Sequence, residues 1–366
     1  MRKEKTMAQK VTLQDVADEL GVSRNTVSKA INNTGILSET TRKKVLAKAI
    51  EMGYKQFSYV DFDNASSQLK AKNTNTEIAL LTTWFLNSSH FSAPMLDKFQ
   101  LEISKFGYSM SMHILQNEDI KNCTLPASLH TERLAGILCI EVFDYDYAAM
   151  LSNSSIPVLF VDSPVDIGKT PLCTDRLLME NSSPIISFIQ NLKQREISHI
   201  GFVGEYMHCQ SFFERYMAYR SGMTIANLAI HKEWILTKNK PGKLHPDNVD
   251  YQSYLQEELE KLTTLPQAFI CANDFVAIDL LHVLNRMKIS IPDEVKILGF
   301  DDAPESRIIH PNLSTVHIHS QILGFSATQL LLSRINEPDM NFRTMHCETN
   351  LVLRTSTGDD NDEKSI

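Results

Sequence analysis

The sequence predicts an α/β protein with two parts, a small all-helical head and a two-lobed body of two parallel α/β subdomains. Three helical patterns occupy the first 57 residues, and strand-sized apolar runs alternate with amphipathic helical patterns from Glu77 onward. That alternation covers about 290 residues, more than one parallel sheet normally needs, which favours two lobes. The predicted parts are a head at 1–57, a linker at 58–76, a body at 77–356 and an acidic tail at 357–366.

The composition indicates a globular protein. The chain has 366 residues, of which 43% are hydrophobic and 22% charged. No apolar run approaches the roughly 20 residues of a membrane-spanning helix, so we expect no membrane partner. The N-terminus lacks an apolar signal segment, and the six cysteines show no CxxC spacing. We therefore expect reduced cysteines and a cytoplasmic location.

Charge is divided unevenly between the two parts. Residues 1–60 hold 11 Lys and Arg against 6 Asp and Glu, whereas the whole chain has a net charge of −8. A basic head on an acidic body suggests that only the head binds a polyanion. Charge alone leaves open the alternative of an ordinary solvated surface.

The head carries three helix start signals. Thr12 and Asp15 have capping-box spacing before a helix at Leu13–Leu20, and Gly21 supplies its end. Ser23 and Ser38 are predicted to cap the second and third helices, and Gly53 to end the third. Only Gly21–Ser23 separates the first two helices, a connection typical of a helix-turn-helix.

The second predicted helix has an apolar face for packing and a polar face for contacts with a partner. Val27, Ala30 and Ile31 share one arc of the helix, and Arg24, Asn25, Ser28 and Lys29 share the opposite arc. Arg and Lys suit guanine edges and Asn suits adenine edges, so the polar arc is a candidate base reader in the major groove. Thr12, Thr26, Lys43 and Lys44 are candidates for phosphate contacts. The alternative is a polar solvent face on a three-helix bundle.

The head resembles the DNA-binding domain of the LacI/GalR family of bacterial transcription regulators. The resemblance rests on Val11–Asn33, Ser38–Arg42 and Met52–Tyr54. It implies base contacts at Arg24, Asn25 and Lys29, where Lys29 stands in place of the usual Arg and relaxes the preference at that base. The resulting DNA-binding set is Thr12, Arg24, Asn25, Thr26, Ser28, Lys29, Asn32 and Leu69.

The linker departs from the family pattern. Neither the Pro-Asn pair nor the Ala-Arg-x-Leu hinge helix of the family follows Tyr54. Asn64–Leu69 is a possible remnant of that helix, which would make Leu69 the minor-groove wedge. The alternative is a flexible polar spacer over Asp61–Thr76.

In the body, the predicted strands are Ile78–Thr82, Tyr108–Ile114, Gly136–Ile140, Val158–Asp162, His199–Val203, Ala268–Cys271 and Val295–Phe300. Intervening helices are predicted at Leu96–Phe106, Ser183–Leu192, Ser211–Ser221, Tyr251–Leu262 and Val276–Met287. Ligands bind such folds beyond the carboxyl ends of the strands. We therefore single out the polar residues that follow a strand.

Asp162 ends a predicted strand, Asn273 and Asp301 each follow one, and Arg215 lies one turn after Ser211 on a helix. Carboxylates, an amide and a guanidinium suit a polyhydroxylated ligand. The alternative, equally weighted, is that the Asp and Asn side chains cap the next helix.

The body also resembles the family's periplasmic-binding-protein-like effector domain, through Ala272–Asp274, Ile291–Asp302, Pro311–Thr315 and the Ser211, Arg215, Tyr219 spacing. The resemblance implies effector contacts at Asp162, Arg215, Asn273 and Asp301. It adds Phe91 as an aromatic pocket residue, with Trp84 as a rival. It further implies a homodimer that binds a pseudo-palindromic double-stranded DNA operator.

An enzyme is the main competing class, but the sequence has no GxGxxG, HExxH or GxSxG motif and no metal spacing among its 12 histidines. An exported solute-binding protein would lack the head. We therefore predict a non-enzymatic repressor of carbohydrate-utilisation genes, without a cofactor or metal, whose DNA binding responds to a small sugar or sugar phosphate. Control by a nucleobase or by a protein partner remains an alternative.

Overall fold

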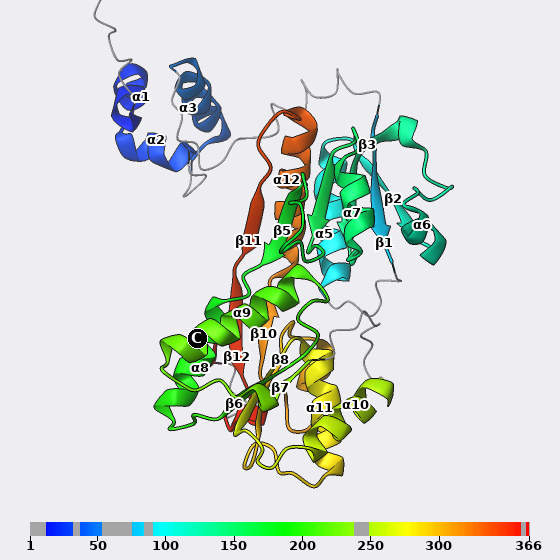
Figure 1. Cartoon of the computed structure of the whole chain (residues 1–366). Coiled ribbons are helices and arrows are strands. Elements are labelled where there is room, and N and C mark those ends of the chain that lie inside the picture. Colours follow the sequence, from blue (N-terminus) through cyan, green and yellow to red (C-terminus); the bar gives the residue numbers. More distant parts are fainter. Residues whose placement is uncertain are drawn as a thin grey trace, which may run out of the picture. The chain divides into compact units, whose positions relative to one another are not determined.

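The structure is a computed structural model that describes residues 12–31, 37–52, 75–83, 91–237, 249–359 and 364–365. The chain forms two compact units, residues 1–72 and residues 73–366 (Figure 1). Asn32, Gly53, Leu69 and Trp84, singled out above, lie outside the described residues. In the part of the chain that the structure covers, no helix is long and apolar enough to span a membrane.

The first unit contains the three predicted helices α1 (Leu13–Leu20), α2 (Arg24–Ile31) and α3 (Glu39–Glu51). The predicted capping box is present, because the Asp15 carboxylate accepts the Thr12 N–H at 2.8 Å and the Thr12 hydroxyl accepts the Asp15 N–H at 3.3 Å. Gly21 ends α1 with a φ of 64°, a left-handed conformation that glycine adopts without strain. Local signals therefore set both ends of α1.

Ser23 and Ser38 cap the other two helices as predicted, each accepting a backbone N–H three residues on at 3.1 Å. The core of the head is formed by small and β-branched side chains that are nearly inaccessible to solvent: Val16, Ala17, Val27, Ala30, Val45 and Ala49. Their small size allows the three helices to approach closely. The core thus orients the polar arc of α2 away from the packing surface.

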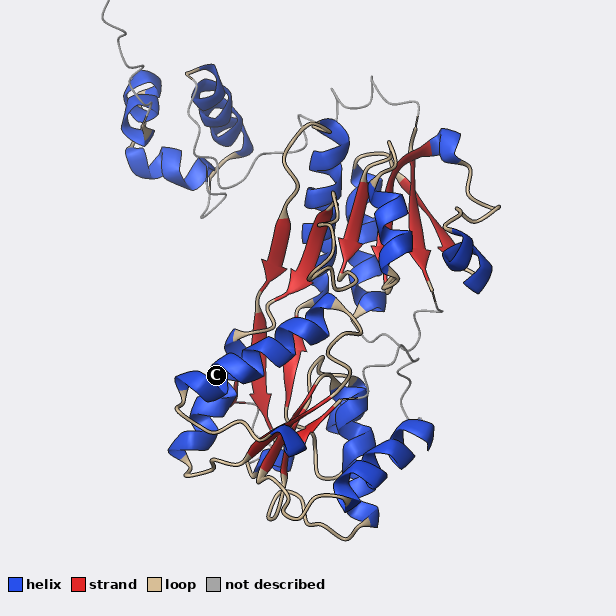
Figure 2. Cartoon of the chain, in the orientation of Figure 1, coloured by secondary structure: helices blue, strands red, loops and turns tan. Residues whose placement is uncertain are grey.

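The second unit contains a lobe built on a parallel sheet of order β11-β5-β4-β3-β1-β2, which we call the N-lobe (Figure 2). Its strands are β1 (Glu77–Thr82), β2 (Ser109–Ile114), β3 (Leu134–Ile140), β4 (Val158–Val161), β5 (Asp175–Met179) and β11 (Thr344–Cys347). Helices α5 (Ser92–Lys105) and α12 (Ser320–Asn336) pack against each other and cover one face, and α7 (Tyr145–Ser152) covers the other. A short helix, α6 (Asn117–Asn122), follows β2.

The C-lobe is built on a parallel sheet of order β7-β6-β8-β9. These strands are β6 (Ile200–Val203), β7 (Ile235–Leu236), β8 (Ala268–Cys271) and β9 (Lys296–Leu298). Helices α8 (Ser183–Gln194) and α9 (Gln210–Ile225) cover one face, and α10 (Val249–Glu260) and α11 (Asp274–Arg286) cover the other. An antiparallel sheet of β10 (Thr315–Ile318), β12 (Thr349–Leu353) and β13 (Lys364–Ser365) adjoins this lobe.

The prediction of two parallel α/β subdomains is confirmed, and the antiparallel sheet is an addition to it. Two predicted strands extend past the observed carboxyl ends. β4 ends at Val161 because Asp162 turns the chain with a φ of 59°, and β9 ends at Leu298, before a turn in which Asp301 has a φ of 119°. In the predicted tail, Thr357 is buried and Asp359 pairs with Arg195 at 3.2 Å.

Candidate functional sites

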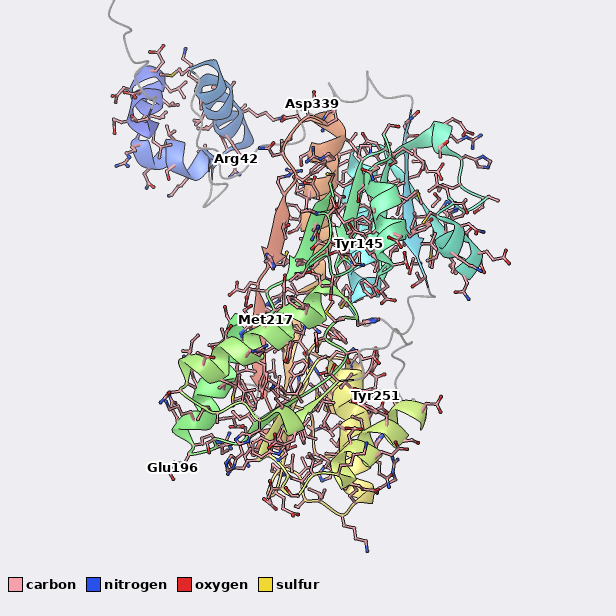
Figure 3. The ribbon with its side chains drawn as sticks, in the orientation of Figure 1. Arg42, Tyr145, Glu196, Met217, Tyr251 and Asp339 are labelled. Atoms are coloured by element: carbon pink, nitrogen blue, oxygen red, sulfur yellow. The ribbon has the colours of Figure 1, made fainter. Side chains whose placement is uncertain are left out.

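The polar arc of α2 forms the candidate nucleic-acid surface. Arg24 and Asn25 are exposed, Thr26, Ser28 and Lys29 are half-buried, and Val27 and Ala30 are buried on the opposite side. The predicted division of this helix into a packing face and a polar face is therefore observed. Arg42, labelled in Figure 3, adds a basic side chain from α3.

Arg215 is the centre of the candidate effector site. It is one of the largest fully buried side chains and lies on α9. Its Nε donates to Asn181 Oδ1 at 2.9 Å, and its Nη1 donates to the Ala272 carbonyl at 2.7 Å and lies 3.5 Å from Asp301 Oδ1. The guanidinium carbon lies 3.6 Å from the centre of the Phe300 ring. The structure thus brings together Arg215 and Asp301, as predicted, and adds Asn181 and Phe300.

Asp162 joins the two lobes. It follows β4 in the N-lobe, and its carboxylate accepts the N–H of Ser163 at 2.8 Å and that of Ser211, at the start of α9 in the C-lobe, at 3.1 Å. The Gln210 N–H adds a second link by donating to the Ser163 carbonyl at 2.8 Å. Asp162 therefore caps a helix, although not the next helix along the chain as the alternative supposed.

The remaining predicted contacts have structural partners of their own. Asn273 caps α11, because its Oδ1 accepts the Val276 N–H at 3.0 Å. The neighbouring Asp274 is buried and accepts bonds from Thr315 Oγ1 at 2.6 Å and the Ala303 N–H at 2.8 Å. Phe91 immediately precedes α5 and packs against the apolar core.

Glu141 is a site residue that the sequence analysis missed. It follows β3 with a φ of 58°, and its carbonyl accepts the Thr83 hydroxyl at 2.8 Å. Burial is the main cause that raises the pKa of Asp301, and electrostatic repulsion from Asp162 and Glu141 adds to it. Glu141 and Asp162 therefore lie near enough to Asp301 to repel its carboxylate, and Arg215 is the cation that opposes them. No residue spacing relates these side chains, so no sequence motif identifies the group.

The pKa values of the adjacent residues Asp301 and Asp302 are shifted in opposite directions. Burial raises the pKa of Asp301 to about 7, although Arg215 opposes the shift. Burial also disfavours ionised Asp302, but bonds from His317, Arg307 and Arg354 hold its pKa well below the usual range. Asp302 is therefore a structural ion-pair centre, whereas Asp301 is held in an environment that disfavours its charge.

This difference predicts that Asp301→Asn stabilises the protein by about 2 kcal/mol above pH 7. A carboxyl with a raised folded-state pKa binds its proton more tightly when folded. Wild-type stability therefore falls as the pH rises from the ordinary value of 3.8 to about 7, and Asn carries no such loss. Denaturant unfolding of both proteins between pH 4 and pH 8 measures the difference.

Asp302→Asn is the matched control because it changes the neighbouring carboxyl in the same way. It removes an acceptor from Arg354 at 2.6 Å and Arg307 at 2.7 Å, so it is expected to destabilise the protein at pH 8. If Asp301→Asn also destabilises the protein at pH 8, the unfavourable environment assigned to Asp301 is wrong.

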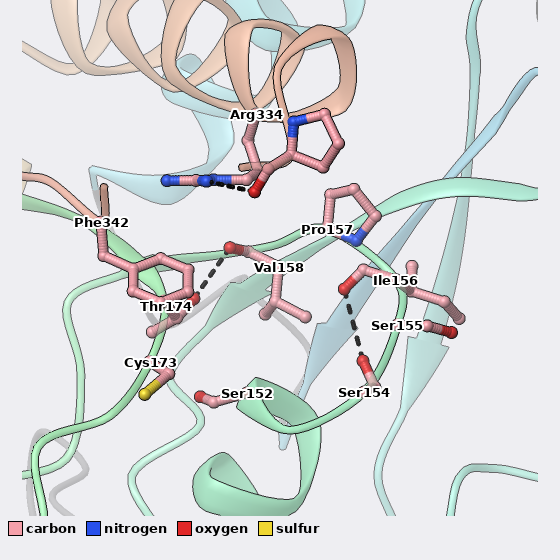
Figure 4. A pocket seen from close by; sticks show the side chains of 11 residues that line it. Ser152, Ser154, Ser155, Ile156, Pro157, Val158, Cys173, Thr174, Arg334 and Phe342 are labelled. Carbon is pink, nitrogen blue, oxygen red and sulfur yellow. Dashed lines mark hydrogen bonds between the residues drawn. The ribbon is translucent and has the colours of Figure 1, made fainter. Parts of the chain in front are cut away.

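A separate hollow of about 130 Å³ lies where α7 ends and β4 begins, away from the strand ends that carry Asp162 and Glu141 (Figure 4). Arg334 and Phe342 line it, together with three serines, Ser152, Ser154 and Ser155. The N–H groups of Arg334 already donate to the Asp175 carboxylate and to the carbonyls of Pro338, Met340 and Asn341. This arginine therefore has its donors occupied and offers no anion site.

Comparison with protein families matches both units. Residues 12–56 match the family described as "Bacterial regulatory proteins, lacI family", and residues 189–357 match the "Periplasmic binding protein-like domain". The first match covers all three helices of the head. The chain belongs to the LacI family. Members of the LacI family are DNA-binding transcriptional regulators and not enzymes, in agreement with the predicted class.

Individual LacI-family relatives align along nearly the whole chain. The "HTH-type transcriptional repressor PurR" of Actinobacillus pleuropneumoniae serotype 3 (strain JL03) is 28% identical, over 94% of this chain and 98% of the relative. The "HTH-type transcriptional regulator GalR" of Lacticaseibacillus casei is 27% identical, over 94% of this chain and 99% of the relative.

Solved LacI-family structures share the fold. A complex of the transcriptional regulator CelR with cellobiose has a TM-score of 0.66 at 20% identity, covering 95% of this chain and 100% of that one. A lac repressor dimer bound to operator and the anti-inducer ONPF has a TM-score of 0.64 at 20% identity, covering 95% and 99%.

Proposed function

We propose that this LacI-family regulator represses carbohydrate-utilisation genes and that a sugar-like effector, bound at the Arg215 cluster, controls its binding to DNA. The observation that carries the proposal is the convergence of Arg215, Asp301 and Asn181 at the carboxyl ends of the strands. Hydroxyl groups of a sugar both donate and accept hydrogen bonds, which suits carboxylates beside one guanidinium.

The charge of the cluster favours a neutral sugar over the sugar phosphate also predicted. The Arg215 guanidinium already lies 3.5 Å from the Asp301 carboxyl group, so a phosphate would have to compete with that carboxyl group for the positive charge. The complex of CelR with cellobiose is a family example with a neutral disaccharide. A nucleobase remains the outcome to distinguish experimentally, because both PurR and GalR proteins are among the relatives.

We further propose that the regulator acts as a homodimer in the cytoplasm, as is typical of the family. Two heads would then read a pseudo-palindromic operator, with Arg24, Asn25 and Lys29 on base edges. Ser28 lies on the same polar arc. Thr12, Thr26, Lys43 and Lys44 would position the head on the phosphates, and Leu69 would wedge the minor groove. A change in lobe closure on effector binding would alter the spacing of the heads and hence operator affinity.

Capture of genomic DNA fragments by the full-length protein at physiological salt tests the proposal. We expect enrichment of a pseudo-palindrome near transport or glycosidase genes, and loss of about 1–3 kcal/mol of operator affinity in Arg24→Ala. Addition of neutral sugars, sugar phosphates and nucleobases to the captured complex then identifies the effector class. Retention of the same fragments by Arg24→Ala with unchanged affinity would contradict the assignment of α2, and enrichment of single half-sites would contradict the dimer.

A further inference from the structure

The two lobes are joined where the chain passes between them. In the described residues the chain crosses at Met179–Ser183, at Ile318–Ser320 and at Cys347–Thr349. The first and third crossings are bonded to each other, since the Glu180 N–H donates to the Cys347 carbonyl at 2.7 Å and the Thr349 hydroxyl donates to the Glu180 carbonyl at 2.6 Å. Any change in the relative position of the lobes must pass through these segments.

Asn181 lies on the first crossing and contacts the candidate effector site directly. Its side chain is buried, its Oδ1 accepts Arg215 Nε at 2.9 Å, and its Nδ2 donates to Glu214 Oε2 at 2.8 Å and to the Met179 carbonyl at 2.9 Å. Because a guanidinium only donates and a carboxylate only accepts, the orientation of the amide is fixed by its two charged neighbours. A single amide thus connects Arg215 to Glu214 by a path outside their shared helix.

Glu214 extends this path to the third crossing. His346 Nε2, on β11, lies 3.3 Å from Glu214 Oε2, while Gln210 Nε2 donates to Glu214 Oε1 at 3.1 Å. Burial opposes ionisation of Glu214, but its bonds from His346, Asn181 and Gln210 lower its pKa, and Glu214 raises the pKa of His346, with a smaller contribution from Glu180. The ion pair therefore joins α9 of the C-lobe to β11 of the N-lobe.

We propose that Asn181 is a positioning residue that transmits the orientation of Arg215 to the lobe crossings through Glu214 and His346. The inference rests on the proposed role of Arg215 in effector binding. We expect a ligand that takes hydrogen bonds from the guanidinium to turn it, and the Nε–H bond to Asn181 to change with that rotation. The amide then changes its bond to Glu214, which alters the pair with His346.

The alternative is that Asn181 only fills a buried position. The titration of His346 distinguishes a positioning role from a purely structural one. Among the described residues His346 is bonded to Glu214 and not to Arg215, so a purely structural Asn181 would not make the titration of His346 depend on Arg215. Nuclear magnetic resonance of histidine-labelled full-length protein, with the signal assigned by His346→Gln, follows its titration. The measurement requires neither operator nor effector, so its failure is separable from failure of the DNA capture experiment.

Arg215→Lys keeps the charge and removes the Nε–H donor. We expect it to shift the titration midpoint of His346 in the presence of Asn181, and to leave the midpoint unchanged in an Asn181→Leu background. Arg220→Lys, on the exposed side of the same helix, is the matched control and should have no effect.

Should Asn181→Leu fail to fold, Asn181→Asp serves instead, because it keeps the acceptor for Arg215 but loses the donor to Glu214. Equal shifts by Arg215→Lys with and without Asn181, or no shift in either background, would overturn the proposal.

Discussion

Asp175→Asn is expected to lower the free energy of unfolding by about 3–5 kcal/mol at pH 7, because it removes one charge from a buried ion cluster. Asp175 begins β5 and is almost fully buried. Its carboxylate accepts Arg334 Nε at 2.9 Å, Arg343 Nη2 at 2.9 Å and the Arg343 N–H at 2.7 Å. An amide in its place leaves two guanidinium groups without their shared counter-charge.

The same cluster predicts a pH dependence. Burial alone would raise the pKa of Asp175, but the bonds from Arg334 and Arg343 outweigh burial and lower it. A lowered folded-state pKa stabilises the protein above the ordinary value of 3.8, and this contribution is lost as the pH falls through the folded-state pKa. The difference between wild type and Asp175→Asn should therefore be largest at neutral pH and shrink in acid.

Denaturant unfolding at pH 7 measures the loss, with Asp146→Asn as the matched control. Asp146 is exposed on α7, and its replacement should change stability by less than about 0.5 kcal/mol. A loss for Asp175→Asn as small as that of the control would mean that the two arginines are stabilised by their carbonyl acceptors alone.

Asp175 also shows why sequence patterns missed β5. The strand begins with Asp175 and Arg176, a charged pair that reads as a loop. Asp175 is buried only because Arg334 and Arg343, more than 150 residues later, neutralise it. Conversely, α1 was predicted with its observed bounds, since Thr12, Asp15 and Gly21 act within the helix itself.

The residues of the candidate site also differ in whether the sequence alone could identify them. Arg215 and Asp301 could be selected from the sequence because Asp301 follows a predicted strand and Arg215 lies one turn after Ser211 on a predicted helix. Asn181 and Glu141 could not, since the relation of Asn181 to Arg215 and that of Glu141 to Asp301 come from the convergence of separate strand ends. For Asp162, the sequence predicted either an effector contact or a cap of the next helix, and the structure has it cap α9 across the lobes.

Arg215→Ala is expected to abolish the response of operator binding to effector and to lower the free energy of unfolding by about 3 kcal/mol at pH 8. The change leaves Asn181 Oδ1 and the Ala272 carbonyl without their donor and removes the positive charge beside Asp301. At pH 6 the loss should be smaller, because Asp301, with a pKa of about 7, is already mostly protonated and depends less on the counter-charge.

Operator affinity in the absence of effector should be unchanged in this variant, since the head forms a compact unit of its own with a separate core. Arg220→Ala is the matched control, as an exposed arginine on the same helix, and should keep both the response and the stability. The decisive measurement titrates effector into the operator complex of each variant. A normal response by Arg215→Ala would remove Arg215 from the effector site, and with it the basis for the path through Asn181.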